Sequence, residues 1–369
     1  MSARIPILDL SAETETLWPE LTGALESVIR SGHFIMGPNV KAFEREVADY
    51  LGVRHAIGLN SGTDALVIGL RALGVGPGDE VITTPFTFFA TAEAVSMVGA
   101  TPVFVDIDPD TYNLDLAQVE ARITERTRAV IPVHLFGHSV DMDPLLALAA
   151  RHDLRILEDV AQAFGASYRG RKVGTIGHMG AYSFFPTKNL GCYGDGGLLV
   201  TDDDALAEQA SMLRTHGSKK KYYNEEIGYN SRLDEMQAAI LRVKLPHIDA
   251  YNQGRREVAA RYAELLAGCD GLTVPAVMPY AEHVFHQYTV RVHAGQRDRV
   301  QEALGEAGIG TMVYYPVPVH RLPVYRGLEY TLPVSERAAT EVLSLPIWPQ
   351  MEREQQERVA GALAAALDG

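Results

Sequence analysis

From about residue 55 to residue 200 the sequence alternates short β-rich runs with stretches of helical periodicity, and this alternation limits the possible folds most strongly. The β-rich runs lie at 53–59, 80–84, 102–107, 129–134 and 154–157. The stretches between them place apolar residues at helical spacing and lie at 64–73, 90–98 and 144–151. Strands that alternate with helices in this way build a mostly parallel sheet with helices on both faces. We therefore predict an α/β fold for this part of the chain.

The pattern changes near residue 234. Two helical stretches, 234–245 and 249–266, are separated by Pro246. Strands and helices then follow in mixed order, with strands expected at 287–292 and 310–315 and helices at 297–307, 335–343 and 352–367. We predict two domains: a large one over residues 1–245, which includes an N-terminal helical segment, and a small α+β domain over residues 246–369.

The overall composition argues against several classes of protein. A formal net charge of −14 disfavours DNA, RNA or anionic lipid as the main partner. No apolar run approaches the ~20 residues that span a bilayer, and the first residues do not resemble a secretory signal. The only two cysteines are Cys192 and Cys269, so we expect no disulfide framework and a cytoplasmic protein. Because no cluster of His, Cys and carboxylate residues has the spacing of metal ligands, we expect no metal site.

One lysine follows an aromatic strand in a context that favours burial. Residues 181–185 are apolar or aromatic, Pro186 breaks the strand, and Lys188 follows. Glycines cluster after the lysine, between residues 191 and 197, and permit close backbone approach. A buried lysine with a lowered pKa is what Schiff-base chemistry requires. A lysine after a strand is nevertheless usually a solvated surface residue, so this interpretation depends on partners elsewhere in the chain.

Three other features supply such partners. The strand at 154–157 leads to Asp159 at the carboxyl edge of the sheet, where open α/β folds bind ligands. Residues 60–66 form a polar turn that opens a helix, and such a turn binds phosphate through its free N–H groups. Phe88 offers a flat ring. Each has a structural explanation when taken alone, as a helix cap or a core aromatic. With Lys188 they match the four needs of pyridoxal 5′-phosphate (PLP): a lysine, a carboxylate for the pyridine nitrogen, phosphate donors and a stacking side chain.

These segments make the sequence similar to the DegT/DnrJ/StrS family of sugar aminotransferases, a branch of the fold-type I PLP-dependent transferases. The likeness runs from residues 32–38 to residues 344–346 and is most specific at 158–197 and 229–239. It implies a transaminase with a large domain, built on a mostly parallel sheet flanked by helices, and a small α+β C-terminal domain. It also implies a nucleotide-sugar substrate, L-glutamate as the amino donor, and a homodimer with shared sites.

The resemblance assigns roles to individual residues. Lys188 corresponds to the catalytic lysine that holds the cofactor, and Asp159 to the partner of the pyridine nitrogen. The further cofactor contacts that it implies are Gly62, Thr63 and Ser183 at the phosphate, Phe88 over the ring, Gln162 at the phenolic oxygen and Asn230 at the phosphate of the neighbouring subunit. The candidate substrate contacts are Arg232, Tyr314, Tyr315 and His320, although a plain surface-loop role explains His320 equally well.

The segment after the lysine indicates which sugar position is aminated. Family members that act on 4-keto sugars usually carry a Gly-Glu-Gly-Gly turn here, whereas this chain has Asp195 in place of the glutamate. It thereby resembles the 3-keto branch, and within it the enzymes that aminate UDP-2-acetamido-2-deoxy-3-oxo-glucuronate for surface polysaccharides. Tyr314 stands where that subgroup has histidine. A dTDP-linked 3-keto-6-deoxyhexose and a 4-keto nucleotide sugar are therefore the alternatives.

Two other functions are compatible with the fold. Family members that dehydrate a sugar at position 3 replace the lysine with histidine, whereas this chain retains Lys188. A non-catalytic regulator that senses PLP or a sugar would not require Lys188, Asp159 and Gln162 together. The sequence also lacks a helix-turn-helix signal or a basic patch for DNA. We therefore expect a transaminase.

Overall fold

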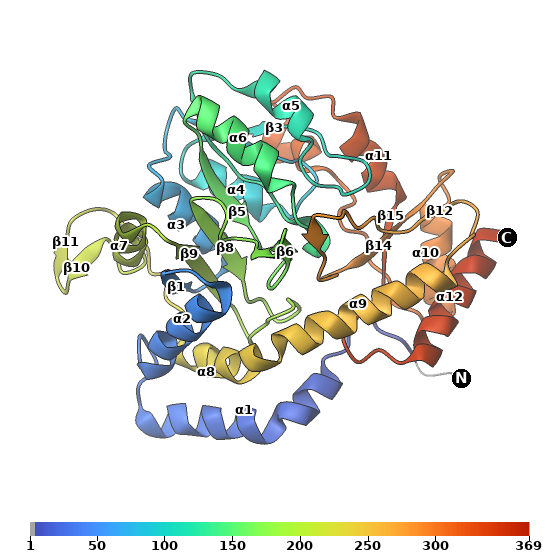
Figure 1. Ribbon diagram of the computed structural model, residues 1–369, viewed down its shortest axis with the longest axis horizontal. Coiled ribbons are helices and arrows are strands. Elements are labelled where there is room, and N and C mark those ends of the chain that lie inside the picture. Colours follow the sequence, from blue (N-terminus) through green and yellow to red (C-terminus); the bar gives the residue numbers. More distant parts are fainter. Residues whose placement is uncertain (1–3, 369) are drawn as a thin grey trace.

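The computed structural model describes residues 4–368 and is built around a seven-stranded sheet (Figure 1). The strand order is β1-β9-β8-β5-β4-β2-β3, in which β9 runs antiparallel to both of its neighbours and the other pairs are parallel. The strands are β1 (His55–Leu59), β2 (Glu80–Thr83), β3 (Thr101–Phe104), β4 (Thr127–Val130), β5 (Arg155–Asp159), β8 (Met179–Ser183) and β9 (Gly197–Thr201). The predicted α/β fold with a mostly parallel sheet is confirmed.

Helices cover both faces of this sheet because the side chains of each strand alternate between two apolar clusters. On β5, for example, Ile156 enters one cluster and Leu157 the other. The first cluster is covered by α2 (Pro38–Leu51), α6 (Met142–His152) and α8 (Glu235–Lys244). The second is covered by α3 (Gly62–Ala72), α4 (Ala90–Met97) and α7 (Asp204–Leu213).

The N-terminal helix and several short elements complete this part of the chain. The N-terminal helix α1 (Ser11–Ser31) packs Leu17 and Leu21 against Ile240 of α8, and Glu13 forms a buried ion pair with Lys244 (2.5 Å). The remaining short elements are α5 (Leu116–Val119), β6 (Ser167–Tyr168), β7 (Arg171–Lys172), β10 (Ser218–Lys220), β11 (Tyr223–Asn224) and β13 (Ala281–Glu282). Strand β13 pairs with β6 in a separate small sheet with β7, which ties the C-terminal third of the chain to the segment after β5.

The C-terminal part has an apolar cluster of its own, to which Tyr262, Val290 and Leu363 contribute. Its three-stranded antiparallel sheet consists of β12 (Leu272–Thr273), β14 (Tyr288–Val292) and β15 (Val342–Leu345). Its helices are α9 (Ile248–Leu265), α10 (Arg297–Glu306), α11 (Pro333–Glu341) and α12 (Arg353–Asp368). This separate cluster supports our proposal that a small domain begins at residue 246, although Ile5 from the other end of the chain also packs into it.

Two predictions for this region are wrong in detail. Residues 310–315 form no strand, and only Met312 makes an isolated bridge, to Ser344. The helix expected over 335–343 ends at Glu341, and the next residues form β15. Residues 342–345 are fully buried, and periodicity alone does not distinguish a short buried strand from a helix end. Among the helices of residues 4–368, none is both long and apolar enough to cross a membrane.

Candidate active site at the carboxyl edge of the sheet

A cavity of about 650 Å³ opens at the edge of the sheet where β5 and β8 end. Asp159 is the last residue of β5 and Ser183 is the last residue of β8, so both strands bring polar side chains to this edge. The loop after β8 returns Lys188 to the same place, and α3 begins there with Gly62. These four residues, which come from three separate parts of the sequence, therefore line one cavity at the edge where α/β sheets bind ligands.

The loop that carries Lys188 is fastened on both sides. The backbone N–H of Lys188 donates to Phe185 O (2.8 Å), which closes a tight turn after β8. The next residue, Asn189, is buried and donates from Nδ2 to Asn252 Oδ1 (2.7 Å) and to Val284 O (3.0 Å). Lys188 itself is half-buried and lines the cavity. Its backbone position is thus set by one local turn and by contacts with two distant segments.

Lys188 and Asp159 influence each other's protonation. Burial lowers the pKa of Lys188 to about 8, and the carboxylate of Asp159 limits this fall. A larger fraction of the amine is therefore neutral near physiological pH than for a lysine in water. Asp159 is 5% exposed and accepts hydrogen bonds from Thr91 Oγ1 (2.9 Å) and Ala161 N (3.1 Å). Burial raises the pKa of Asp159, whereas these donors and Lys188 lower it.

A second part of the cavity lies at the start of α3. Ser61 is the N-cap and accepts a hydrogen bond from Asp64 N (3.1 Å), which leaves the N–H groups of Gly62 and Thr63 without helical partners. Gly62 is required here because a Cβ at this position would lie 2.6 Å from the Cβ of Ser183. Free N–H groups and hydroxyls that converge at a helix start form an anion site.

Aromatic side chains and one glutamine form the remaining wall. Phe88 is 60% exposed in the chain, and its ring centroid lies 6.3 Å from that of Tyr315. Gln162 is held at both ends of its amide: Oε1 accepts from Phe136 N (2.7 Å), and Nε2 donates to Tyr315 Oη (2.9 Å). Tyr314 lines the same cavity. The link between Gln162 and Tyr315 could not be seen in the sequence.

The residues of this cavity fit PLP. The cofactor needs a lysine, a carboxylate, phosphate donors and a flat side chain, and each is present on a different segment of one wall or edge. The steric evidence is at Gly62. Because this residue has no Cβ, the helix start can lie close to Ser183, and its N–H groups stay free to bind a phosphate. The lowered pKa of Lys188 is the matching electrostatic evidence, because a neutral amine is required to react with a carbonyl group.

Three predicted site residues lie outside the cavity. Asn230 is exposed and accepts a hydrogen bond from Arg232 Nη2 (2.6 Å). Both residues follow the hairpin of β10 and β11, which projects from the body of the chain (Figure 1). His320 is buried, with Nε2 3.1 Å from Glu336 Oε1 and its ring beside Phe104. His320 therefore does not line the cavity of the single chain, and its predicted contact with the substrate is not supported there.

The sequence did not reveal two residues that the segment before β14 contributes to the cavity wall. His286 and Gln287 line the cavity beside Lys188, and both precede β14 in the C-terminal part of the chain. No motif marks them, because their position depends on how the C-terminal segment packs against the large sheet. Their presence means that both parts of the chain contribute to the site.

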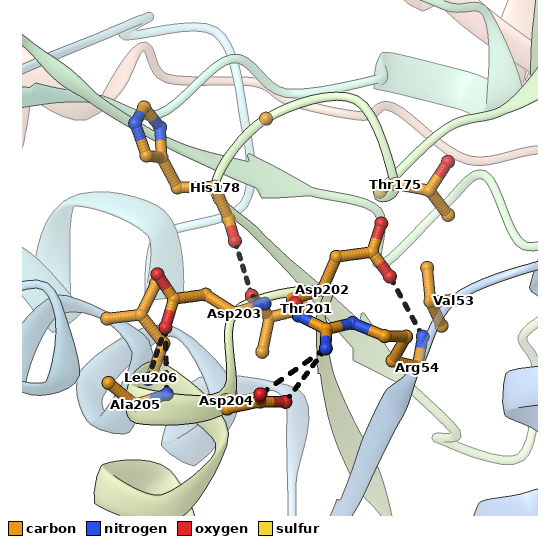
Figure 2. Close-up of a pocket in the computed structure, with 12 residues that line it drawn as sticks. Val53, Arg54, Thr175, His178, Thr201, Asp202, Asp203, Asp204, Ala205 and Leu206 are labelled. Atoms are coloured by element: carbon orange, nitrogen blue, oxygen red, sulfur yellow. Dashed lines mark hydrogen bonds and ion pairs between the residues drawn. The ribbon is translucent and has the colours of Figure 1, made fainter.

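A second hollow of about 620 Å³ lies where β9 ends and β8 begins, at the opposite edge of the sheet (Figure 2). Asp203 caps α7 by accepting from Ala205 N (2.8 Å) and Leu206 N (3.1 Å). Asp204 pairs with Arg54 (3.1 Å), and Arg54 N donates to an oxygen of the neighbouring aspartate, Asp202 (2.8 Å). These groups stabilise the surface of the sheet. Within residues 4–368, no three His, Cys, Asp or Glu side chains form a metal site.

Comparison with known proteins gives consistent matches along the whole chain. A sequence profile of the DegT/DnrJ/EryC1/StrS aminotransferase family matches residues 16–364. A pleiotropic regulatory protein of Geobacillus stearothermophilus is 54% identical, over 98% of both chains. The UDP-N-acetyl-3-dehydro-alpha-D-glucosamine 3-aminotransferase of Acidithiobacillus ferrooxidans is 49% identical, over 99% of this chain and 98% of its own. The dTDP-3-amino-3,4,6-trideoxy-alpha-D-glucose transaminase of Streptomyces venezuelae is 50% identical, over 98% and 95%.

Solved structures agree with these sequence matches. The crystal structure of DesV from S. venezuelae, in complex with a ketimine intermediate, superposes with a TM-score of 0.97. The two sequences are 49% identical, and the match covers 100% of both chains. At this identity the similarity extends beyond the fold to the family of enzymes.

Proposed function

Because the chain belongs to the DegT/DnrJ/EryC1/StrS aminotransferase family and is a PLP-dependent aminotransferase, we propose that it aminates C3 of a nucleotide-linked 3-keto sugar. The names of two relatives that are 49% and 50% identical, one for a UDP-linked and one for a dTDP-linked sugar, support this proposal. The observation that carries the transamination itself is the placement of Lys188 and Asp159 in one cavity beside the helix start at Gly62. The product would be an amino sugar of the kind used in surface polysaccharides.

Lys188 is assigned the proton transfers. When bound, PLP supplies an electron sink that stabilises negative charge on the carbon next to the amino group. Nζ of Lys188 takes the proton from Cα of the amino donor, for which we propose L-glutamate, and in the second half of the reaction it delivers a proton to C3 of the sugar. A pKa near 8 suits this role, because the same group must accept and release a proton at the working pH.

The other residues hold and orient the reactants. The buried carboxylate of Asp159 would attract the positive charge of the pyridine nitrogen and so keep that nitrogen protonated. Gly62, Thr63 and Ser183 would hold the phosphate, and Phe88 would stack on the ring. The second N–H of Gln162 Nε2 is available for the phenolic oxygen, because the first is already donated to Tyr315.

The charges in the cavity bear on the sugar. Asp159 and Asp195 both line it, and no arginine of residues 4–368 does. Lys188 is the only cation among the described residues of the lining, and it is reserved for the chemistry, so a sugar carboxylate would face two aspartates without a cation of its own; this favours an uncharged sugar over UDP-2-acetamido-2-deoxy-3-oxo-glucuronate. We propose an uncharged 3-keto hexose, either the dTDP-linked 6-deoxy sugar or a UDP-linked N-acetylhexosamine.

A homodimer would complete the site. Asn230 is exposed and Arg232, which donates to it, is half-buried; both follow the projecting hairpin and lie outside their own cavity, so a neighbouring chain can meet them there. We propose that Asn230 contacts the phosphate across the subunit interface. Arg232 would bind the carboxylate of the amino donor, because a guanidinium forms paired hydrogen bonds with a carboxylate.

The test is an absorbance spectrum of the purified protein before and after L-glutamate is added. Lysine-bound PLP absorbs at about 410–420 nm, and conversion to the pyridoxamine form moves this band to about 330 nm. The converted protein is then mixed with UDP- and dTDP-linked 3-keto and 4-keto sugars. Return of the first band with the 3-keto sugars alone supports the proposal. Return with only the 4-keto sugars would show that the assigned position is wrong.

A further inference from the structure

His286 lies in the wall of the cavity that holds Lys188, although no motif assigns it a role. It is 8% exposed and belongs to the segment that leads into β14. Arg255 of α9 fixes the backbone of this segment, because its Nη1 donates to Phe285 O (3.2 Å) and to His286 O (3.3 Å). The position of the imidazole is therefore set by the packing of the C-terminal part of the chain.

A chain of buried amides determines which ring nitrogen of His286 carries the proton. Phe164 O can only accept, so the group that faces it is Nδ2 of Asn252 (3.0 Å). Oδ1 of Asn252 therefore accepts from Nδ2 of Asn189 (2.7 Å), whose other hydrogen goes to Val284 O (3.0 Å). Oδ1 of Asn189 must then be the acceptor in its 3.2 Å contact with Nδ1 of His286.

It follows that Nδ1 of His286 is protonated and Nε2 carries a lone pair. Within residues 4–368, no group donates a hydrogen bond to Nε2. Burial and the nearby cations Lys188 and Arg255 hold the pKa of His286 well below its usual range, so the ring stays neutral. The cavity therefore contains one neutral acceptor in a fixed orientation; the cations that act on it are Lys188 and Arg255, and the carboxylates of the same cavity are Asp159 and Asp195.

We propose that His286 is a positioning residue for Lys188: once the cofactor occupies the cavity and the Lys188 amine is released from it, Nε2 of His286 accepts a hydrogen bond from that amine. A free amine on a flexible four-carbon side chain rotates, and its lone pair points in many directions. One hydrogen bond to a fixed acceptor removes this freedom and aims the lone pair at the reacting carbon. The inference rests on the proposed role of Lys188 and extends it, because it explains how the amine is held between its two proton transfers.

Two substitutions separate the two ring nitrogens. His286→Asn retains a donor near Nδ1 for Asn189 and removes the acceptor at Nε2, whereas His286→Gln places an amide near Nε2 and gives up the bond to Asn189. We expect His286→Asn to lower kcat about 10- to 100-fold with KM for L-glutamate within about twofold, since orientation and not binding is lost. His286→Gln should recover a substantial part of that loss, and His286→Phe should not.

The second readout is the pKa of Lys188 itself, measured without any sugar. The protein is loaded with pyridoxamine 5′-phosphate, which leaves Lys188 free, and the rate of Lys188 acetylation by acetic anhydride is followed against pH by peptide mass spectrometry. In His286→Asn the pKa of Lys188 should fall by about one unit, because a hydrogen bond to a charged donor stabilises the ammonium form more than the amine. His286→Gln should lie closer to the wild type.

The proposal is overturned if His286→Asn leaves both kcat and the Lys188 titration unchanged. It is also overturned if all three variants lose activity and thermal stability together while the Lys188 titration stays constant, since that pattern belongs to a packing role. A wild-type protein that binds the cofactor but aminates no 3-keto sugar would contradict the proposed function alone. The Lys188 titration would still decide the role of His286 in that case.

Discussion

Two hollows of similar size lie at opposite edges of the same sheet, and they differ in how their charged groups are compensated. The cavity of Lys188 measures about 650 Å³ and the hollow of Arg54 about 620 Å³. In the hollow of Arg54, the aspartates cap a helix or pair with a cation (Figure 2). In the cavity, burial has moved the pKa of Lys188 to about 8, and the N–H groups of a helix start have no helical partner. The two hollows therefore have nearly the same volume. They differ in that the cavity of Lys188 combines backbone N–H groups without helical partners with a lysine whose pKa is lowered.

Strand direction accounts for this difference. The cavity lies at the carboxyl ends of β5 and β8, where Asp159 and Ser183 emerge and loops return over the edge. The second hollow lies at the amino end of β8 and at the carboxyl end of β9, the antiparallel strand. If this comparison is right, substitutions at the first edge should abolish chemistry with little effect on stability. Substitutions at the second edge should lower the free energy of unfolding and leave catalysis nearly unchanged.

The largest effect is expected at Lys188. Lys188→Ala removes the group that holds the cofactor and transfers the protons, so kcat should fall by about 10³-fold or more. The band at about 410–420 nm should be lost as well, because no lysine is left to bind PLP covalently. Lys172→Ala, a substitution of a lysine outside the cavity that donates to Gly165 O, is the matched control and should retain both. Turnover near the wild-type level in Lys188→Ala would exclude the assignment.

Asp159→Asn should have the next largest effect. The substitution preserves shape but removes the charge that faces the pyridine nitrogen, and we expect kcat to fall about 10²- to 10³-fold. Because burial raises the pKa of the Asp159 carboxyl, the neutral amide should be tolerated structurally, and the melting temperature should not decrease. Steady-state kinetics with a thermal melt measure both quantities. A large loss of stability with unchanged kcat would assign Asp159 a structural role.

The positions of these two residues could be predicted from the sequence because each depends on a local pattern. Asp159 ends an apolar strand, and Lys188 follows an aromatic strand and a proline, so the direction of the strands places both at one edge. The polar turn at Gly62 is equally local. Most of the large sheet followed from the same kind of evidence.

The parts that could not be predicted depend on distant contacts. His286 reaches the cavity because Arg255 of α9 holds the backbone of its segment and Asn189 contacts its ring. Strand β15 forms because residues 342–345 pair with β14, and a short apolar run carries no sign of this pairing. The proposed role of Asn230 also depends on a distant contact, in this case with a second chain, because Asn230 is exposed in the single chain.

Gly62→Ala should have an intermediate effect. The added Cβ would lie 2.6 Å from the Cβ of Ser183, so the helix start must shift and its N–H groups can no longer converge on a phosphate. We expect the dissociation constant of PLP to rise about 10- to 100-fold, the loss of one or two charge-assisted hydrogen bonds. Gly76→Ala is the control, because a Cβ at Gly76 would meet nothing within 4 Å. Fluorescence titration with PLP compares the two variants, and equal affinities would place the phosphate elsewhere.

At the second edge, Asp203→Ala should alter stability alone. The Asp203 carboxylate caps α7, and loss of such a cap costs about 1 kcal/mol of unfolding free energy. The absorbance band and kcat should stay within about twofold of the wild type, because none of the described residues that line this hollow also lines the cavity. Urea unfolding and kinetics on one preparation provide both values. If Asp203→Ala lost PLP binding but not stability, the conclusion that the hollow of Arg54 has only a structural role would be wrong.

Arg54→Gln should have the smallest effect of all. Its ion pair with Asp204 is exposed on both sides, and at physiological salt such pairs are screened and contribute little. Unlike Asp203, Arg54 does not satisfy the first N–H groups of α7, so its charge can be removed without leaving buried donors unpaired. Unfolding curves at low and at high salt should therefore differ slightly between Arg54→Gln and the wild type at low salt and coincide at high salt. A difference that persists at high salt would mean that the groups of this hollow are coupled more strongly than exposed ion pairs are.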